Sequence, residues 1–325
     1  MELTPETWNM VGRHGGAGLA LGLGGIGAAV GMGMAAAKAN EAIMRQPERQ
    51  GHLLRTMLIG QAVGGSPSIF ALVIGLLILF LPAPASSSGP LFAAAMVGAG
   101  LCIGLGCLGS GAGCGWPAAA ACEGVARNPG RATAVTSVMV ISQAVAQSPS
   151  IFATVIALIL LFVHLPGSGA AAIGIGIGAG LAMGASAFGP GLGSGLVGGG
   201  AVQGASAWPK SQSITLRTML VGQAVCQTPT IFGMLIAFIM LFTMQGIEPG
   251  LVGFSKPFGA SLAIGFGAIG PGVGCGFVGE RTCVATAAKP HNDLLLLRSM
   301  LIGQAVAQGN AIFALIVSLA VLFAA

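Results

Sequence analysis

Charged residues are scarce in this chain of 325 residues. Asp, Glu, Lys and Arg together make up 6% of the sequence, whereas hydrophobic residues make up 54%. Soluble domains usually carry about a quarter charged residues, so this composition excludes an ordinary soluble protein. Tyrosine is absent, which removes one of the two residue types that form aromatic belts at membrane surfaces. The mean hydropathy of +0.91 predicts a polytopic membrane protein.

The sequence also lacks any recognisable catalytic or metal-binding pattern. Its four histidines are scattered at the edges of apolar stretches, and most of its seven cysteines lie inside them. The glycine-rich strings have no phosphate-binding Lys-[Ser/Thr], and no basic face suits a nucleic acid. We therefore expect no enzyme activity, no cofactor, no metal site and no nucleic-acid partner. The first residues begin with acids and do not have the pattern of a cleavable signal.

The tripeptide Gln-Ala-Val recurs four times along the chain. It begins at Gln61, Gln143, Gln223 and Gln304, so the intervals are 82, 80 and 81 residues. Each copy has a Gly-rich arm followed by an arm rich in Leu, Ile, Val and Phe, and each arm exceeds the roughly 20 residues that cross a membrane. This repeat predicts an all-α membrane protein with eight transmembrane helices in four helical hairpins, at residues 1–84, 85–166, 167–247 and 248–325.

The two kinds of arm favour different places in a membrane. Helices associate in lipid through close backbone approach at small residues, so the Gly-rich arms are suited to an inner layer and the bulky arms to a lipid-facing one. Because hairpin repeats close most simply by rotation, we expect a two-layered oligomeric ring. Generic tight packing in a helix bundle is the alternative.

The basic residues predict the orientation. Eleven of the thirteen Lys and Arg flank the turns of the four hairpins, and only Arg13 and Lys256 lie toward the other side. Since basic loops stay in the cytoplasm, we expect cytoplasmic hairpin turns, with both termini on the outer side.

The longer motifs resemble those of the c subunit of rotary ATP synthases, most closely the sodium-using branch. The likeness rests on FGPGLGSG at 188–195 in a first helix, CEGVARNPGRA at 122–132 in a loop, and MLIGQAVGGSPSIFALVIGLLILF at 57–80 in a second helix, and it covers the chain four times over. The resemblance implies a proteolipid that forms a rotor ring with copies of itself, holds lipid in the lumen, and works with central-stalk and stator subunits. Its stalk-docking loop is matched by Arg45-Gln46-Pro47 and Arg127-Asn128-Pro129, whereas the third and fourth loops differ.

The family carries its proton or sodium ion on one acid of the second helix. The positions that match this acid are Gly65, Gln147, Gln227 and Gln308, and none of them is acidic. Of the eight acids in the chain, Glu280 is the deepest. We interpret it as an interfacial charge, and a displaced ion carrier is the alternative.

A neutral polar belt remains at this depth. It comprises four glutamines, three hydroxyl residues and three valines whose carbonyls prolines free from the helical ladder; these are Gln61, Gln143, Gln223, Gln304, Ser66, Ser148, Thr228, Val63, Val145 and Val225. In the sodium branch the matching Val carbonyl and Ser hydroxyl look like ion ligands. The facing first-helix ligand is lost, because Met32, Cys114, Ser194 and Cys275 stand there. Hydrogen bonding between helices and a hydrated or weakly ion-coordinating belt both remain open.

An amide neither titrates nor offsets the charge of a cation. The sequence therefore predicts a c-type rotor-ring protein that is ion-inert by itself or is mixed with acid-bearing subunits. The alternative is a c-type ring reused as a scaffold or pore-like assembly in another membrane machine.

Overall fold

The computed structural model describes residues 4–82, 89–163, 169–244 and 250–323. All regular structure in these ranges is helical. Eight helical spans within them are long and apolar enough to cross a membrane. The expected all-α fold of four repeated hairpins is thus confirmed.

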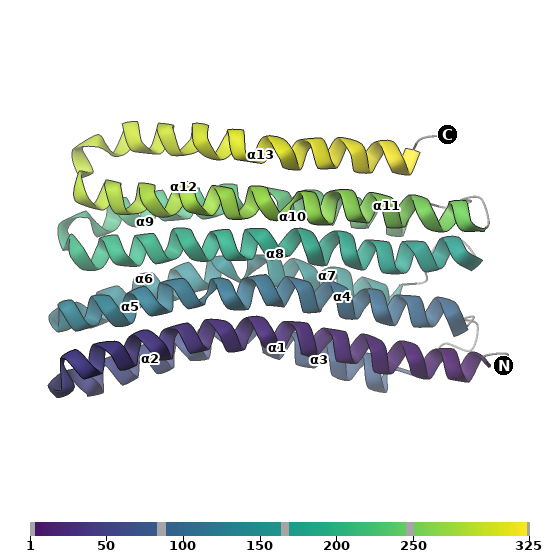
Figure 1. The fold of residues 1–325 in the computed structure, drawn as a ribbon, viewed down its shortest axis with the longest axis horizontal. Helices are drawn as coiled ribbons and strands as arrows, with labels where there is room; N and C mark the ends of the chain where they lie inside the picture. Colours follow the sequence, from purple (N-terminus) through teal and green to yellow (C-terminus); the bar gives the residue numbers. More distant parts are fainter. Residues whose placement is uncertain (1–3, 83–88, 164–168, 245–249, 324–325) are drawn as a thin grey trace.

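The first arms form one layer. These are α1 (Pro5–Arg45), α4 (Gly89–Gly113) continued by α5 (Gly115–Arg127), α8 (Gly169–Ala207), and α11 (Leu251–Gly267) continued by α12 (Ile269–Ala288). They lie side by side in chain order, so one chain is an open row with α1 at one end and α11–α12 at the other (Figure 1). We call this the inner layer.

Glycine explains why the helices of the inner layer lie so close together. A Cβ atom on Gly113 would overlap the backbone oxygen of Gly191, and one on Gly193 would overlap that of Gly272. Backbone therefore rests directly on backbone, which is how helices associate where lipid removes the hydrophobic drive.

The second arms form an outer layer. In Figure 1 those of the first three hairpins lie behind the inner layer, and that of the fourth lies at the edge of the view beside the last inner helices. They are α2 (Gln50–Gly64) with α3 (Ser66–Phe80), α6 (Ala132–Ala146) with α7 (Ser148–Phe162), α9 (Gln212–Cys226) with α10 (Thr228–Phe242), and the single helix α13 (Asp293–Phe323). Three of these arms break shortly before a proline, at Gly65, Gln147 and Gln227. In the fourth, Asn310 replaces the proline and the helix continues.

Four 3₁₀ turns join the layers at one end of the molecule. They are η1 (Pro47–Arg49), η2 (Pro129–Arg131), η3 (Pro209–Ser211) and η4 (Pro290–Asn292). Each turn begins with proline, whose fixed φ suits a first helical position. The first helix begins and the last helix ends at the opposite end (Figure 1).

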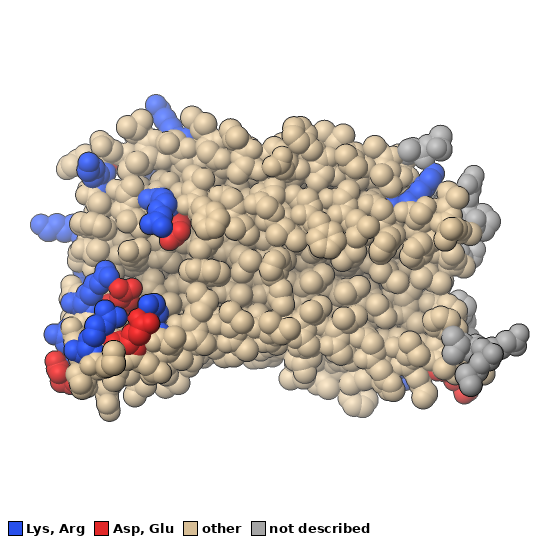
Figure 2. Space-filling view, viewed as in Figure 1, with Lys and Arg blue, Asp and Glu red and all other residues tan. Residues whose placement is uncertain are grey.

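Charged side chains gather toward the hairpin turns. Figure 2 shows the inner-layer face, where the middle of the surface carries no Lys, Arg, Asp or Glu. Near the turns, Lys38 and Arg45 pair with Glu41, and Arg127 pairs with Glu123. The distribution fits a chain whose middle lies in hydrocarbon.

Candidate functional site

The Gln-Ala-Val glutamines of the last three hairpins bridge two repeats. The Nε2 atom of Gln143 donates to the carbonyl oxygen of Cys114 in its own hairpin (3.0 Å) and to that of Gly60 in the preceding one (2.9 Å). Gln223 and Gln304 repeat this pattern, and all three side chains are fully buried. Each amide therefore joins an inner helix to the outer helix of the neighbouring hairpin.

The glutamines at the carrier position make a second bridge of the same kind. Gln147 Nε2 donates to the carbonyl oxygen of Val63 at 2.7 Å. Gln227 donates to Val145, and Gln308 to Val225. Because proline follows each valine by four residues, these carbonyls have no helical donor, and the amide of the next repeat supplies one.

The first hairpin lies at one end of the described row and therefore differs from the other three. Gln61 Nε2 donates to the carbonyl oxygen of Met32 at 3.1 Å, which corresponds to the bond of Gln143 to Cys114. Gly65 stands at its carrier position and has no side chain to extend. Within the described residues, the first hairpin therefore makes the amide bond inside its own hairpin but neither of the bonds that the later hairpins make to a preceding repeat.

The predicted hydroxyls are not brought into the amide contacts. Ser66, Ser148 and Thr228 head the helices after the breaks, and no hydrogen bond within the described ranges joins their hydroxyls to the glutamines. Ser68 and Ser150 instead donate to the carbonyls of Gly65 and Gln147, both at 2.7 Å. The hydroxyls that support the breaks thus come two residues later than expected.

The belt is uncharged and rich in acceptors. The Oε1 atoms of Gln143, Gln223 and Gln304 are buried and accept no hydrogen bond from the described residues. The Nε2 atoms of Gln147, Gln227 and Gln308 donate to valine carbonyls that lack a helical donor. Leaving such a carbonyl unpaired in a low-dielectric interior would be costly. The amides therefore link neighbouring repeats, and no carboxyl group of the described residues takes part in these contacts.

The acids of the described residues lie away from the belt. Glu280 lines a small depression of about 190 Å³ near the hairpin turns together with Lys38, Glu123 and Arg127. No group of three His, Cys, Asp or Glu within the described ranges is arranged to hold a metal ion. The interpretation of Glu280 as a charge near the turn end therefore fits its position.

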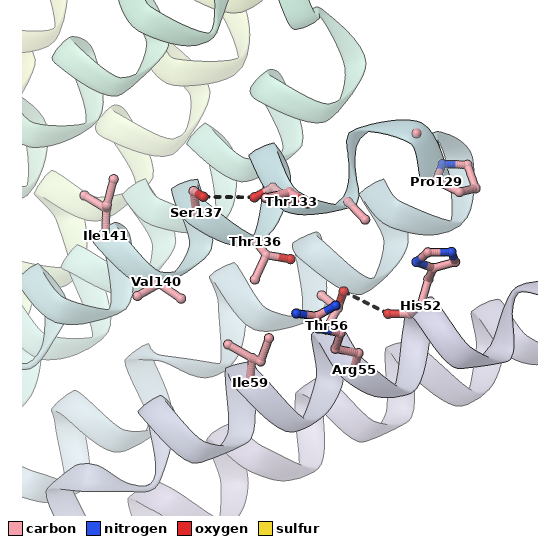
Figure 3. Close-up of a pocket in the computed structure, with 12 residues that line it drawn as sticks. His52, Arg55, Thr56, Ile59, Pro129, Thr133, Thr136, Ser137, Val140 and Ile141 are labelled. Atoms are coloured by element: carbon pink, nitrogen blue, oxygen red, sulfur yellow. Dashed lines mark hydrogen bonds between the residues drawn. The ribbon is translucent and has the colours of Figure 1, made fainter.

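A groove of about 630 Å³ opens between α2 and α6 close to the turns (Figure 3). His52 and Pro129 lie at its turn end, and Ile59, Val140 and Ile141 extend toward the membrane interior. The outer helices therefore stand apart here, while the inner helices remain in backbone contact. The amide bridges lie deeper, where they tie the outer layer of one repeat to both layers of the next.

The turns also bond from one repeat to the next. Arg49 Nη1 donates to the carbonyl oxygen of Ala126 (2.9 Å), and Arg131 Nη2 to Oε1 of Gln212 (2.6 Å). The third and fourth repeats have Ser211 and Asn292 at these places. The four turns thus present different side chains to any partner.

Two-layered hairpins with glycine inside and a polar break in the outer helix define a class of multi-pass membrane proteolipid. A family model described as the C subunit of ATP synthase matches the chain four times, at residues 15–78, 97–160, 177–240 and 258–321. The chain belongs to this family, with four copies of its hairpin in one polypeptide.

Individual relatives agree. The chain is 55% identical over 67 residues to the ATP synthase c subunit of Alkaliphilus oremlandii, which covers 20% of this chain and 73% of the relative. It is 47% identical over 78 residues to the ATP synthase c subunit 2 of Cereibacter sphaeroides, covering 24% and 93%. Over 198 residues it is 30% identical to the K subunit of the A-type ATP synthase of Methanocaldococcus jannaschii, covering 60% and 81%.

Sequence reasoning missed the acceptors of the first glutamine in each motif. The sequence alone suggests that Met32, Cys114, Ser194 and Cys275 mark a lost half of the site, yet their backbone carbonyls are the acceptors. A carbonyl is present whatever the side chain, so no residue type reveals it. The spacing of 29 residues between the two partners, constant in all four repeats, is the available signal.

Proposed function

We propose that this chain is a ring-forming subunit of a rotary ATP synthase whose own hairpins do not carry ions. Copies of the chain form the ring with lipid in its lumen, and other subunits, including the central stalk and stator, work against it. The hairpin turns face the cytoplasm and both termini the outer side. Arg45-Gln46-Pro47 and Arg127-Asn128-Pro129 are the turns that suit a stalk partner.

One observation carries this proposal. At three interfaces within the chain, an amide at the carrier position donates to the valine carbonyl that proline frees. An amide proton thus takes the acceptor that the family resemblance assigns to the ion. Because glutamine is neutral and supplies no counter-charge, a cation gains little from entering.

The amide donors of the belt also already have hydrogen-bond acceptors without any bound ion. A bond between membrane helices contributes about 0.6 to 2 kcal/mol, so three such bridges stabilise the row of hairpins noticeably. The belt therefore acts as a structural joint, and ion transport by the assembled ring requires acid-bearing subunits beside this chain.

Two measurements test the proposal. Purification from native membrane in mild detergent, followed by mass spectrometry, should recover stalk and stator subunits together with the chain. Proteoliposomes holding the purified chain and a stator subunit should show no proton or sodium flux above that of empty liposomes. Flux with this chain alone would contradict the ion-inert assignment.

A second candidate is a c-type ring reused as a scaffold in another membrane machine. The observation that favours it is that the third and fourth turns carry Trp208-Pro209-Lys210 and Lys289-Pro290-His291 in place of the Arg-containing motif. Recovery of an intact ring with other membrane proteins, and without any stalk or stator subunit, would favour this candidate.

A further inference from the structure

Each end of the row carries one half of the contact that joins neighbouring repeats inside the row, and that half has no partner within the described residues. One glycine of each inner helix faces the following repeat, and in the first three repeats it touches that repeat's backbone. These three are Gly31, Gly113 and Gly193, and their added Cβ atoms would overlap the oxygens of Gly111, Gly191 and Gly272. The fourth equivalent, Gly274, would meet only a side chain of its own hairpin, at 3.6 Å.

The opposite end has the complementary half. A second glycine of each inner helix faces the preceding repeat. In the last three repeats it lies against backbone; these are Gly115, Gly195 and Gly276, packed on Gly31, Gly113 and Gly193. The equivalent in the first repeat is Gly33, whose Cβ would meet nothing within 4 Å.

The outer layer shows the same incomplete pairing. Gln143, Gln223 and Gln304 each donate to a backbone carbonyl of the preceding repeat. Among the described residues, Gln61 donates only to the carbonyl oxygen of Met32 in its own hairpin. The acceptor that corresponds to Gly60, Ser142 and Gly222 in the last repeat is Gly303, at the far end of the chain.

The carrier-position bond is the one contact for which both sides are altered at the ends of the row. Inside the chain, each carrier-position glutamine meets a carbonyl freed by a proline of the preceding repeat. At the ends, the glutamine is replaced by Gly65 and the proline by Asn310. Because α13 runs unbroken through this point, the carbonyl of Val306 has its helical donor and needs no amide.

The exposure of the side chains around Asn310 shows that it lies on the open face of the last repeat. The prolines of the first three repeats are buried, whereas Asn310 is exposed and Val306 is 77% exposed. A polar side chain at membrane depth is costly unless it faces a partner. Asn310 therefore marks a face that is covered in the membrane.

We infer that, where copies of this chain meet head to tail in the proposed ring, Asn310 of one copy lies opposite Gly65 of the other, in place of the glutamine-to-carbonyl bond of the internal interfaces. We call this pairing the polar code of the seam. Gly33 of one copy lies on Gly274 of the other, Gln61 donates to the carbonyl of Gly303, and Asn310 occupies the space left by Gly65. The inference rests on the proposed ring and names the faces that close it. Joining like face to like face would leave both glycine contacts and the Gln61 donor unmatched.

Cross-linking of the purified full-length chain tests the docking. Arg131 and Gln212 touch between the second and third repeats, and their equivalents at the seam are Asn292 and Gln50. The variant carrying Gln50→Cys and Asn292→Cys should give a ladder of linked copies ending in a closed ring. All seven native cysteines are buried, so they do not compete.

The single variants are the matched controls. Neither Gln50→Cys nor Asn292→Cys alone should form linked dimers. Dimers from either single variant, or no ladder from the double variant, would overturn head-to-tail docking. Because no other subunit is present, this result is independent of whether the chain co-purifies with synthase subunits.

A double-mutant cycle tests the polar code. Gly65→Gln alone places an amide opposite a carbonyl that is already bonded, and Asn310→Pro alone frees a carbonyl with no donor. Each should lower ring stability in detergent by about tenfold. The double variant recreates an interface of the internal kind and should recover most of the loss. Losses that simply add would overturn the pairing of Gly65 with Asn310.

Two further variants separate docking from folding. Gly33→Val should leave the thermal unfolding of the single chain unchanged while reducing ring assembly at least about tenfold, since its side chain enters only the seam. Gly274→Val on the opposite face should do the same. Assembly at the wild-type level by both variants would contradict the proposed contact.

Discussion

The inner and outer layers join the same four hairpins by different means. Inner helices meet through glycine, backbone against backbone, along most of their length. Outer helices stand apart near the turns, where a groove separates α2 from α6, and are tied at mid-depth by amide bridges. Contact in the inner layer is therefore a matter of shape, while contact in the outer layer depends on a few polar groups that must find partners.

The largest expected effect comes from adding bulk to the inner layer. Gly113→Val would drive a side chain into the backbone of α8, where no flexible neighbour can move aside. We expect the free energy of unfolding to fall by about 3 kcal/mol or more, measured by denaturation in mixed micelles. Gly51→Val, at a glycine with open space around it, should cost less than about 1 kcal/mol, and an equal loss there would refute the argument from shape.

Charge at the outer-layer bridge should have the next largest effect. With Gln147→Glu, a protonated carboxyl donates to Val63 as the amide does, but an ionised one cannot donate and is buried unpaired. Stability should therefore match the wild type at low pH and fall by about 2 kcal/mol or more as pH rises. Gln147→Leu should lose about 1 kcal/mol at every pH. Parallel pH curves for both variants would be inconsistent with this account.

Removing the proline at a helix break should change the free energy of unfolding less. Pro149→Ala allows the helix to continue as α13 does, so the carbonyl of Val145 gains a helical donor and shares its acceptor capacity with Gln227. We expect a change in the free energy of unfolding within about 1 kcal/mol. Hydrogen exchange of the new backbone amide at position 149 should show protection close to that of its helical neighbours. Rapid exchange there would mean that the break does not depend on proline.

The smallest effect is expected at the turns. Arg131→Ala removes a part-buried side-chain bond to Gln212 near the membrane surface, and polar contacts of this kind contribute little. Its cost should be within about 0.5 kcal/mol. A larger loss in the same micelle assay would show that the turns, rather than the layers, hold the repeats in register.

Much of this arrangement follows from the sequence, because composition and periodicity act locally. The repeat of Gln-Ala-Val predicts the hairpins, and the contrast between glycine-rich and bulky arms predicts the layers. The carrier-position residues lie in the outer arms, where Gly65, Gln147 and Gln227 stand at the breaks and Gln308 lies within α13. Their functional role stays a prediction. The continuity of α13 is also readable, since Asn310 replaces the proline that interrupts the other arms.

The contacts between repeats could not be predicted from the sequence. The bridges of Gln143 and Gln147 end on backbone carbonyls of the preceding hairpin, and a carbonyl leaves no mark in the sequence. The same holds for the docking of Gly113 on α8, because many glycines are present and only the structure shows which of them touch. The sidedness of the turns and their partners remain predictions.

Fusing four hairpins into one polypeptide has a consequence for symmetry. A closed assembly of such chains contains hairpins only in multiples of four, and its rotational order equals the number of chains. Three of every four neighbouring contacts form at the high effective concentration of a single molecule, so only the fourth limits assembly. Because the turns after α1, α5, α8 and α12 differ, any body moving around the circumference meets four unlike positions in fixed succession before the first recurs.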